Sequence, residues 1–445
     1  MTSVERGQVP GQAAEPVPGP APGPVPGPAP GPVPGPVPER TTGDAPPTFR
    51  DRLARLLDPT APADPALRGL RVRRAWPANL GDPNDGLVLE LQAPEDAAND
   101  AGGSATGVGA TPPGRVGATS PGRVGATLTD RGLHLLAGDP KLPSLTARLA
   151  AGETVVSLRP GKRAVLRTGD GRYVKLARRT ATRRALDRLA AVDGLLEGVA
   201  GAPARPAILA GNVTTGMLEL APADGVTLAD VLAAASTPAD VVTHARACAD
   251  ALVALASVRP GPDDAAGIGT HSLADEATVL ARWAVAALEL APLTDVERTW
   301  LTGEAARVAQ ELRDAAGASG TGDAAPVLAH RDLHDGQILC ADVETDAETD
   351  HGPGGGVRLT VLDWDTAAWA HPAADLANLL AHVDRLARLD RVRPPVAQGF
   401  NDHLLDALEA AGHPALTDPA AGRLLDVLIE ATALRLVAVH AFRPR

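Results

Sequence analysis

Three short motifs between residues 330 and 375 constrain the fold of this chain more than any other part of its sequence. The first, at 330–337 (HRDLHDGQ), follows a short apolar run at 326–329. The second, at 361–365 (VLDWD), also ends an apolar run, and the third, at 372–376 (PAADL), opens a helical pattern. Short apolar runs bounded by polar loops are typical of buried strands. We therefore expect two strand ends to bring several carboxylates to one place.

Asp332 and Asp363 have the chemistry that phosphoryl transfer requires. That reaction needs a carboxylate near the attacking hydroxyl group and oxygen ligands that hold magnesium against the phosphates. Asp332 suits the first role, and Asp363 with Gln337 suits the second. A single His-x-Asp motif occurs by chance, and an Asp at a strand end is more often a turn residue or a helix cap. Three motifs in this order favour a functional site over coincidence.

The three motifs resemble those of the aminoglycoside phosphotransferase and choline kinase-like family, which are small-molecule relatives of the protein kinases. The catalytic loop of that family is similar to His-Gly-Asp-Leu-His-x-x-Asn. Arg331 stands here in place of the glycine, and Gln337 in place of the asparagine. The resemblance implies an α+β class and a bilobal, protein-kinase-like fold, with a small antiparallel N-lobe and a mainly helical C-lobe.

The resemblance also implies a role for each residue of the motifs. Asp332 would orient the substrate hydroxyl or accept its proton, while Asp363 and Gln337 would hold Mg²⁺ between the phosphates of ATP. The remaining polar residues are expected to support the loop or the metal: His330, Arg331, Asp365 and Asp375.

A strand meander precedes the motifs and carries the lysine expected to bind nucleotide. Short apolar runs with tight glycine turns between residues 154 and 176 predict three antiparallel strands. Lys175 lies on the third strand, where the resemblance places a lysine that contacts the nucleotide phosphates. The turn at 159–162 (RPGK) would cover the nucleotide. An exposed strand lysine is the alternative interpretation of Lys175.

Two acidic residues are expected beside the nucleotide. Asp187, on a helix predicted at 182–196, would pair with Lys175, and Glu197 is a less well placed candidate. Glu219 lies next to the expected hinge, whose backbone would contact adenine in a member of this family. Asp187 and Glu197 could also be plain surface charges.

Helical periodicity dominates the rest of the chain. It predicts helices at 228–235, 241–255, 273–290, 295–315, 374–390, 396–411 and 421–441. His271 and Asp275 could face the substrate, although a helix cap and a surface charge are the plainer interpretation. The acidic and glycine-rich insertion at 341–356 is interpreted as a solvated hairpin tip.

Composition suggests four regions. Residues 1–47 are rich in proline and glycine, which predicts a disordered tail. Residues 48–150 are expected to form a capping subdomain with a helix at 49–57, strands at 70–76 and 87–91, and a disordered loop at 92–127. The N-lobe is expected at 151–223 and the C-lobe at 224–445.

The charge of the chain limits its partners. The formal net charge is −12 and the pI about 5.4, which argues against nucleic-acid binding or an anionic membrane surface. The two cysteines, Cys248 and Cys340, are too few for a disulfide framework. Residues 1–10 do not have the pattern of a signal peptide, and no apolar run has the length of a membrane span. We expect a cytoplasmic protein without an obligate protein partner.

These expectations combine into a predicted function. The chain would be an ATP- and Mg²⁺-dependent phosphotransferase acting on a hydroxyl group of a small molecule related to aminoglycosides, sugars or amino alcohols. The alternative is a catalytically impaired pseudokinase that binds a nucleotide or another ligand, which the residues Gln337 and Asp187 suggest. A scaffold acting through the tail is a third idea. A protein kinase is disfavoured because no pair of Asp-Phe-Gly and Ala-Pro-Glu motifs brackets an activation loop in this chain.

Overall fold

The computed structural model describes residues 49–92, 123–261, 268–317, 324–342 and 356–444, apart from the single residues 59, 63, 68, 81, 83, 84, 130, 131 and 137. The predicted tail at 1–47 and most of the predicted hairpin tip, residues 343–355, lie outside the described residues. Residues Pro47–Arg445 form one compact unit.

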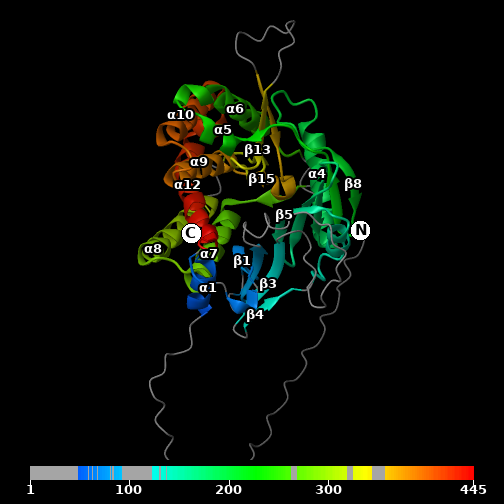
Figure 1. Cartoon of the computed structure of the whole chain (residues 1–445). Helices are drawn as coiled ribbons and strands as arrows, with labels where there is room; N and C mark the ends of the chain where they lie inside the picture. The colour runs from blue at the N-terminus through cyan, green and yellow to red at the C-terminus, as the bar shows by residue number, and fades with distance from the viewer. Residues whose placement is uncertain are drawn as a thin grey trace, which may run out of the picture. The chain divides into compact units, whose positions relative to one another are not determined.

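The first elements are a helix and a small antiparallel sheet (Figure 1). Helix α1 (Phe49–Leu57) precedes the strands β1 (Arg71–Pro77), β2 (Leu87–Gln92), β3 (Arg123–Thr129) and β4 (Gly132–Leu135), which are paired in chain order. Leucines at alternate positions of β2 are almost fully buried. The helix and the first two strands were predicted from the sequence.

The disordered loop predicted at 92–127 is wrong at both ends. Gln92 closes β2, and β3 begins at Arg123 and pairs with β2 from Arg123 to Leu128. The small residues of β3 resemble a low-complexity segment in sequence. Ala126 and Leu128 nevertheless both point towards the core and are fully buried. This alternation is the pattern of a strand with one buried face. Residues 93–122 lie outside the described residues.

The second sheet is the antiparallel meander that carries Lys175. Its strands are β5 (Thr154–Arg159), β6 (Arg163–Arg167), β7 (Tyr173–Ala177), β9 (Met217–Leu220) and β8 (Ile208–Asn212), in that spatial order. The prediction of β5–β7 and β9 is confirmed. Strand β8 was missed because four of its five residues are exposed and give no apolar alternation.

Two helices flank this second sheet. Helix α3 (Leu145–Ala150) belongs to a separate apolar cluster in which Leu145 and Leu149 are buried together with residues of β5, β6 and β7. Helix α4 (Arg179–Leu196) contributes Leu189, Val192 and Leu196 to the main core. The sequence analysis placed the residues of α3 in the capping subdomain, whereas α3 packs against the second sheet. The predicted domain boundary at residue 150 therefore stays a proposal.

The rest of the chain is mainly helical (Figure 1). Its helices are α5 (Leu228–Ala234), α6 (Val242–Ser257), α7 (Leu273–Leu290), α8 (Asp295–Gly317), α9 (Ala374–Arg388), α10 (Pro394–Ala410), α11 (Pro414–Thr417) and α12 (Pro419–His440). Every helix predicted from periodicity is present, with ends shifted by a few residues, and only the short α11 was not predicted. The antiparallel sheets together with these helices confirm the α+β class.

Two three-stranded sheets hold the motifs within this helical part. Strands β10 (Val226–Thr227), β13 (Ile338–Asp342) and β14 (Val357–Val361) form one sheet. Strands β11 (Thr270–His271), β15 (Ala368–Ala370) and β12 (Val327–Ala329) form the other. Trp364 and Trp369 are almost fully buried beside these strands, so the motifs rest on a packed base.

Helix α1 and the first sheet contact both the helical part of the chain and the second sheet. The Ala75 N–H donates a hydrogen bond of 2.9 Å to the Phe442 carbonyl oxygen, and an Arg50 N–H donates one of 2.8 Å to the Leu288 carbonyl oxygen. On the other side, the Arg159 guanidinium lies 5.7 Å from the centre of the Trp76 ring. The described residues of 49–92 and 123–135 are therefore integral to the fold.

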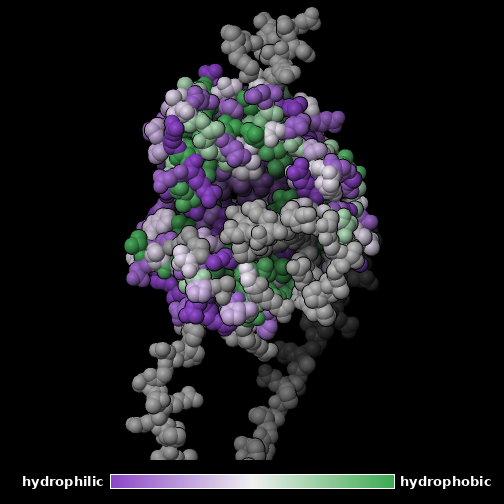
Figure 2. All heavy atoms as spheres, viewed as in Figure 1, coloured by the Kyte–Doolittle hydropathy of each residue, from purple (hydrophilic) through white to green (hydrophobic). Residues whose placement is uncertain are grey.

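Few large hydrophobic side chains are exposed among the described residues. Figure 2 shows hydrophilic and hydrophobic side chains interspersed over the helical part. The large exposed hydrophobic residues are scattered along the described chain: Val156, Leu209, Val226, Val285, Val296 and Leu389. Cys248 and Cys340 are buried free thiols, and burial raises the pKa of Cys340 to about 12. None of the helices in the described part of the chain is both long and apolar enough to span a membrane.

Candidate active site

The β13–β14 hairpin places Gln337 and Asp363 at the same end of the sheet. Ile338 pairs with Val361, and the Leu362 N–H donates a hydrogen bond of 2.9 Å to the Gln337 carbonyl oxygen. Gln337 directly precedes β13, and one residue, Leu362, separates the end of β14 from Asp363. The pairing register therefore brings together the two residues that were predicted as metal ligands.

Lys175 reaches the same point from strand β7. Its Nζ lies 2.5 Å from Asp363 Oδ1 and 2.5 Å from Asp365 Oδ2, and the lysine is only 9% exposed. Burial raises the pKa of Asp363, but the charges of Lys175 and Arg163 outweigh it and lower the pKa to about 2. The Asp363 carboxylate is therefore ionised at neutral pH. Asp363, an anionic oxygen donor of the kind that binds hard cations, thus lies next to Lys175, a cation suited to phosphates.

His330 and Asp375 hold the loop that carries Asp332. The backbone N–H groups of His330 and Arg331 each donate a hydrogen bond of 2.7 Å to the Asp375 carboxylate. His330 Nε2 lies 2.7 Å from the Leu362 carbonyl oxygen, and the Asp332 N–H donates to His330 Nδ1 at 3.3 Å. Because a carbonyl oxygen only accepts and a backbone N–H only donates, Nε2 is the donor and Nδ1 the acceptor in these two contacts. His330 thus connects the loop to the end of β14.

Asp332 is half-buried at the centre of this loop. Among the described residues, no side chain forms a hydrogen bond or an ion pair with the Asp332 carboxylate. The carboxylate is therefore available to accept a hydrogen bond from a bound hydroxyl group, which is the geometric requirement for a general base.

Arg331 adopts the left-handed backbone conformation, with φ 68°. Glycine takes this conformation without strain, which explains why a glycine suits this position in the motif that the loop resembles. The Arg331 side chain donates a hydrogen bond of 3.1 Å to the Thr366 carbonyl oxygen and lies 3.2 Å from His271 Nε2. These contacts give the strained residue a fixed position.

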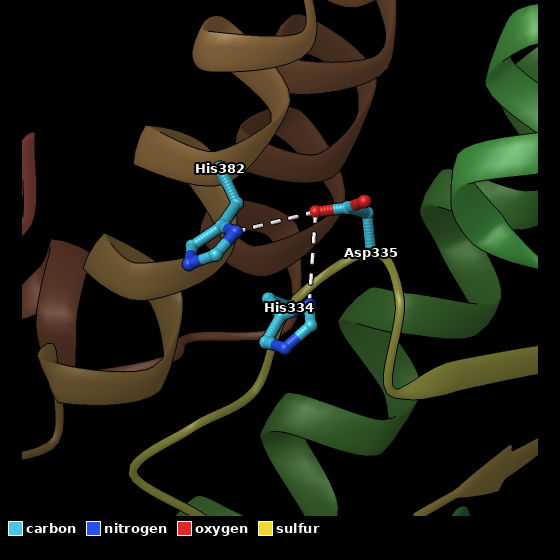
Figure 3. A group of neighbouring side chains, drawn as sticks. All are labelled: His334, Asp335 and His382. Carbon is cyan, nitrogen blue, oxygen red and sulfur yellow. Dashed lines mark ion pairs between the residues drawn. The ribbon is translucent and has the colours of Figure 1, made fainter. Parts of the chain in front are cut away.

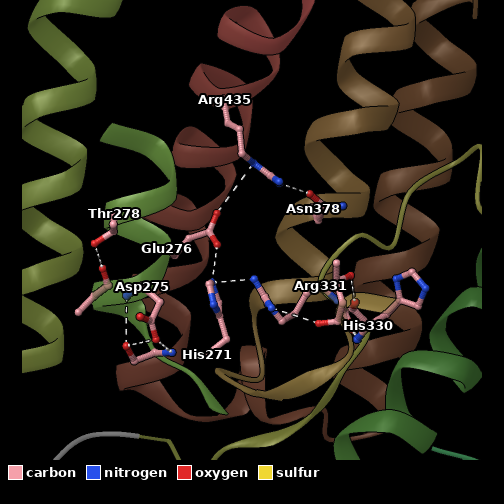
Figure 4. A network of polar contacts seen from close by, with 12 residues as sticks. His271, Asp275, Glu276, Thr278, His330, Arg331, Asn378 and Arg435 are labelled. Carbon is pink, nitrogen blue, oxygen red and sulfur yellow. Dashed lines mark hydrogen bonds and ion pairs between the residues drawn. The ribbon is translucent and has the colours of Figure 1, made fainter. Parts of the chain in front are cut away.

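A polar network under the loop includes His271 and Glu276 (Figure 4). His271 Nε2 lies 2.9 Å from Glu276 Oε2, and Arg435 Nε lies 3.9 Å from Glu276 Oε1. Arg435 also donates a hydrogen bond of 2.7 Å to Asn378 Oδ1. Asp275 caps α7 together with Ser272, as the plainer interpretation of the sequence predicted. Because His271 Nε2 cannot both donate to Glu276 and accept from Arg331, Glu276 is the anion that joins this network, and both His271 and Arg331 lower its pKa.

Replacing Glu276 with glutamine is expected to flatten the pH dependence of stability. Burial raises the pKa of Glu276, but His271, Arg435 and Arg331 outweigh it and lower the pKa to about 2, from an ordinary value of 4.5. A carboxyl group whose pKa is lowered by folding stabilises the protein fully above its unfolded pKa, and this contribution is lost as the pH falls towards the folded value. The pH window for the loss is therefore 4.5 to about 2.

Urea unfolding at several pH values from neutral down into this window measures the effect. The control is Glu289→Gln, an exposed glutamate on the same helix, which should follow the unaltered protein. Equal slopes of unfolding free energy against pH in Glu276→Gln and the unaltered protein would contradict the assignment.

His334, Asp335 and His382 form a second polar group next to the loop (Figure 3). Asp335 Oδ1 lies 3.4 Å from His382 Nδ1 and 3.8 Å from His334 Nδ1. The two imidazole rings stack with centroids 4.5 Å apart and 9° between their planes. A metal ion binds an imidazole nitrogen close to the ring plane at about 2.0–2.1 Å. One ion cannot lie in the planes of two stacked rings, so His334 and His382 do not share a metal ion in this arrangement.

The contacts of His334 agree with a hydrogen-bonded brace. The Gly336 N–H donates to His334 Nδ1 at 3.0 Å, which requires an unprotonated nitrogen there. Burial, with a smaller effect of His382, lowers the pKa of His334 to about 4, so the ring is neutral at pH 7. We interpret this group as a support of the loop, which sequence reasoning missed.

The predicted pairing of Asp187 with Lys175 is wrong. Asp187 is exposed on α4 and forms no ion pair with Lys175, which instead contacts Asp363 and Asp365. The buried residues of α4 include Ala185 and Leu189. At 100° per residue, Asp187 lies about 200° from Ala185 and therefore on the opposite face. Its neighbour Arg188 donates hydrogen bonds to the Asp365 and Ile268 carbonyl oxygens instead. Glu197 is also exposed.

Glu219 does not face Lys175. In the register of β7 and β9, Glu219 pairs with Val174 and Lys175 pairs with Leu218. Adjacent residues of a strand point to opposite faces of the sheet, so the Glu219 side chain lies on the other face and forms an ion pair with Arg172. The nucleotide contact expected here is made by the backbone of the hinge next to Glu219 and stays a prediction, while the side chain is paired with Arg172.

The fold and the site together define a phosphotransferase-type protein, and a comparison with protein families agrees. The model of a family described as "Phosphotransferase enzyme family" matches residues 161–425, which is more than half of the chain. The chain therefore belongs to this family, as the motifs predicted.

Solved structures that resemble the chain have low sequence identity to it. The aminoglycoside phosphotransferase APH(3'')-Id from Streptomyces rimosus is 20% identical with a TM-score of 0.40, over 65% of this chain and 96% of that one. The macrolide 2'-phosphotransferase MphH from Brachybacterium faecium is 18% identical with a TM-score of 0.39, over 68% and 97%. An aminoglycoside-3'-phosphotransferase of type VIII is 20% identical with a TM-score of 0.42, over 65% and 98%. A search of curated proteins gave no match. The family assignment rests on the family model.

Proposed function

We propose that this chain is an ATP- and Mg²⁺-dependent phosphotransferase that phosphorylates a hydroxyl group of a small molecule. Membership of the phosphotransferase family supports the class of reaction. The observation that carries the proposal is the meeting of Lys175 and Asp363 beside the loop of Asp332. These are the cation, the metal ligand and the base that transfer to a hydroxyl requires.

The residues at the end of the β13–β14 hairpin fit magnesium. Mg²⁺ prefers hard oxygen ligands, one or two of them carboxylates. Asp363 supplies an ionised carboxylate, since its pKa is about 2, and Gln337, the residue before β13, would supply an amide oxygen. Asp365 adds a second carboxylate within reach of Lys175. When bound, Mg²⁺ would neutralise charge on the phosphates.

The residues of the chain itself have distinct roles in this proposal. Asp332 would orient the acceptor hydroxyl and take its proton as the phosphoryl group moves. Lys175 would exchange its two carboxylate contacts for the nucleotide phosphates. His330 and Asp375 keep the loop of Asp332 in place through the hydrogen bonds to Leu362, His330 and Arg331 described above.

The acceptor is proposed only as a hydroxylated small molecule. A net charge of −12 favours a cationic acceptor through long-range attraction. A catalytically impaired pseudokinase gains no support from the family, and Asp332, Lys175 and Asp363 are all present.

Thermal unfolding with and without ATP and magnesium tests the nucleotide site. A ligand at a hundred times its dissociation constant adds about 2.7 kcal/mol of stability, which raises the melting temperature by a few degrees in a protein of this size. We expect this shift to require both ATP and Mg²⁺ and to be lost in Asp363→Asn. The control is Asp170→Asn, an exposed residue of the β6–β7 turn, which should keep the shift.

Turnover is then measured as ADP formation with a panel of aminoglycosides, sugars and amino alcohols. We expect at least one acceptor to raise ADP formation above its basal rate. If ATP and Mg²⁺ together produced no stabilisation of the unaltered protein, the proposed function would be wrong.

A further inference from the structure

Arg163 contacts the same carboxylate as Lys175 but was not recognised from the sequence. Arg163 Nη1 lies 3.4 Å from Asp363 Oδ2, while Lys175 Nζ lies 2.5 Å from Asp363 Oδ1. The two cations therefore approach opposite oxygens of one carboxylate. Arg163 keeps 47% of its side chain exposed, so it remains accessible to a ligand.

The strand register explains how Arg163 reaches this point. On the paired strands β6 and β7, Val165 lies opposite Lys175 and Arg163 lies opposite Ala177. Residues two apart on a strand point to the same face, so Arg163 and Lys175 project from one face of the sheet. Ala164 and Leu166 point to the other face and are fully buried in the apolar cluster of α3.

The turn before Arg163 has no free backbone donor for phosphates. Loops that bind phosphate through the backbone do so with unpaired N–H groups. The Gly161 N–H donates to Asp139 Oδ2 at 2.5 Å, and the Lys162 N–H donates to the Arg159 carbonyl oxygen at 3.0 Å. Pro160 has no N–H group. Side chains must therefore supply the contacts that the backbone of this turn cannot.

The turn is also held firmly from outside. Arg178 Nη2 donates a hydrogen bond of 2.8 Å to the Gly161 carbonyl oxygen, and Asp139 is only 9% exposed. Rearrangement to release the Gly161 N–H would break these contacts. Arg163, by contrast, is held by one long ion pair that is partly exposed, and such pairs contribute little to stability. Arg163 can therefore move from Asp363 to a ligand at small cost.

We propose that Arg163 is a second phosphate-binding cation of the nucleotide site, and that its side chain replaces the backbone contacts of a glycine-rich loop. A guanidinium group binds phosphate oxygens through two parallel N–H donors. This inference rests on the proposed function, because it takes the nucleotide phosphates to lie beside Lys175 and Asp363.

Nucleotide binding by Arg163→Gln tests this inference. We expect the dissociation constant for ATP with Mg²⁺ to rise about tenfold or more, as for other charge-assisted hydrogen bonds. Adenosine, which has no phosphate, should bind as it does to the unaltered protein, and Arg163→Lys should recover part of the loss. Calorimetric titration of the full chain measures all three.

Arg167→Gln is the matched control, since Arg167 is an exposed arginine at the other end of β6. It should leave ATP affinity unchanged, and both variants should melt at the temperature of the unaltered protein without nucleotide. Equal ATP affinity in Arg163→Gln and the unaltered protein, or an equal loss of adenosine affinity, would overturn the inference alone. A lack of ATP binding by the unaltered protein would overturn the proposed function and this inference together.

Discussion

Asp332→Asn is expected to lower kcat by about 10²–10⁴-fold and to leave the affinity for ATP nearly unchanged. The Asp332 carboxylate is half-buried, and no described side chain binds it. In the proposed function its main contact is with the acceptor hydroxyl, and mainly as the proton is transferred. Asparagine keeps the size of the side chain but cannot accept that proton. An interaction made in the transition state alone lowers kcat and not binding.

The measurement is steady-state kinetics with an active acceptor, together with titration of ATP. Asp402→Asn, an exposed residue of α10, is the control and should retain full kcat. A variant Asp332→Asn with unchanged kcat would exclude Asp332 as the base. A large loss of ATP affinity would instead point to a structural role for Asp332.

The sequence predicted which residues lie together where each of them is next to a predicted strand. Asp363 and Gln337 each lie next to a strand, and pairing of those strands brings them together. The approach of Lys175 to Asp363 across the two parts of the fold followed from the resemblance alone. No local pattern connects residues so far apart in the chain.

Helical phase and strand register account for the errors. Asp187 has a suitable charge at a suitable distance in sequence from Lys175, but it lies opposite the buried face of α4. The spacing of the apolar residues of α4 already predicts that Asp187 lies on the exposed face. The register of β9 likewise turns the Glu219 side chain away from Lys175, a direction that the sequence prediction did not specify.

Other features depended on long-range contacts that have no signal in one sequence. Arg163 becomes a candidate only when the register of β6 against β7 is known. The hydrogen bond between Asp139 and the Gly161 N–H joins segments from two different subdomains of the predicted organisation. The contact between His271 and Arg331 likewise joins residues 60 positions apart.

Asp375→Ala is expected to destabilise the protein by about 3 kcal/mol or more, since a buried N–H group without an acceptor costs about 1–3 kcal/mol. Asp375 is 4% exposed and accepts the N–H groups of both His330 and Arg331 at 2.7 Å. Burial raises the pKa of Asp375, and these hydrogen bonds oppose that effect. Removal of the carboxylate leaves one buried and one partly buried N–H donor unpaired at the start of the Asp332 loop, so kcat should fall as well.

Urea unfolding at neutral pH measures the loss of stability, and steady-state kinetics measures the loss of kcat. Asp375→Asn keeps one acceptor oxygen for two N–H donors and should therefore lose less stability than Asp375→Ala. Asp406→Ala, an exposed position of α10, should change the unfolding free energy by less than about 0.5 kcal/mol. If Asp375→Ala were as stable as this control, the two backbone hydrogen bonds would not be what holds the loop. A stable variant with low kcat would show that Asp375 positions Asp332 without stabilising the fold.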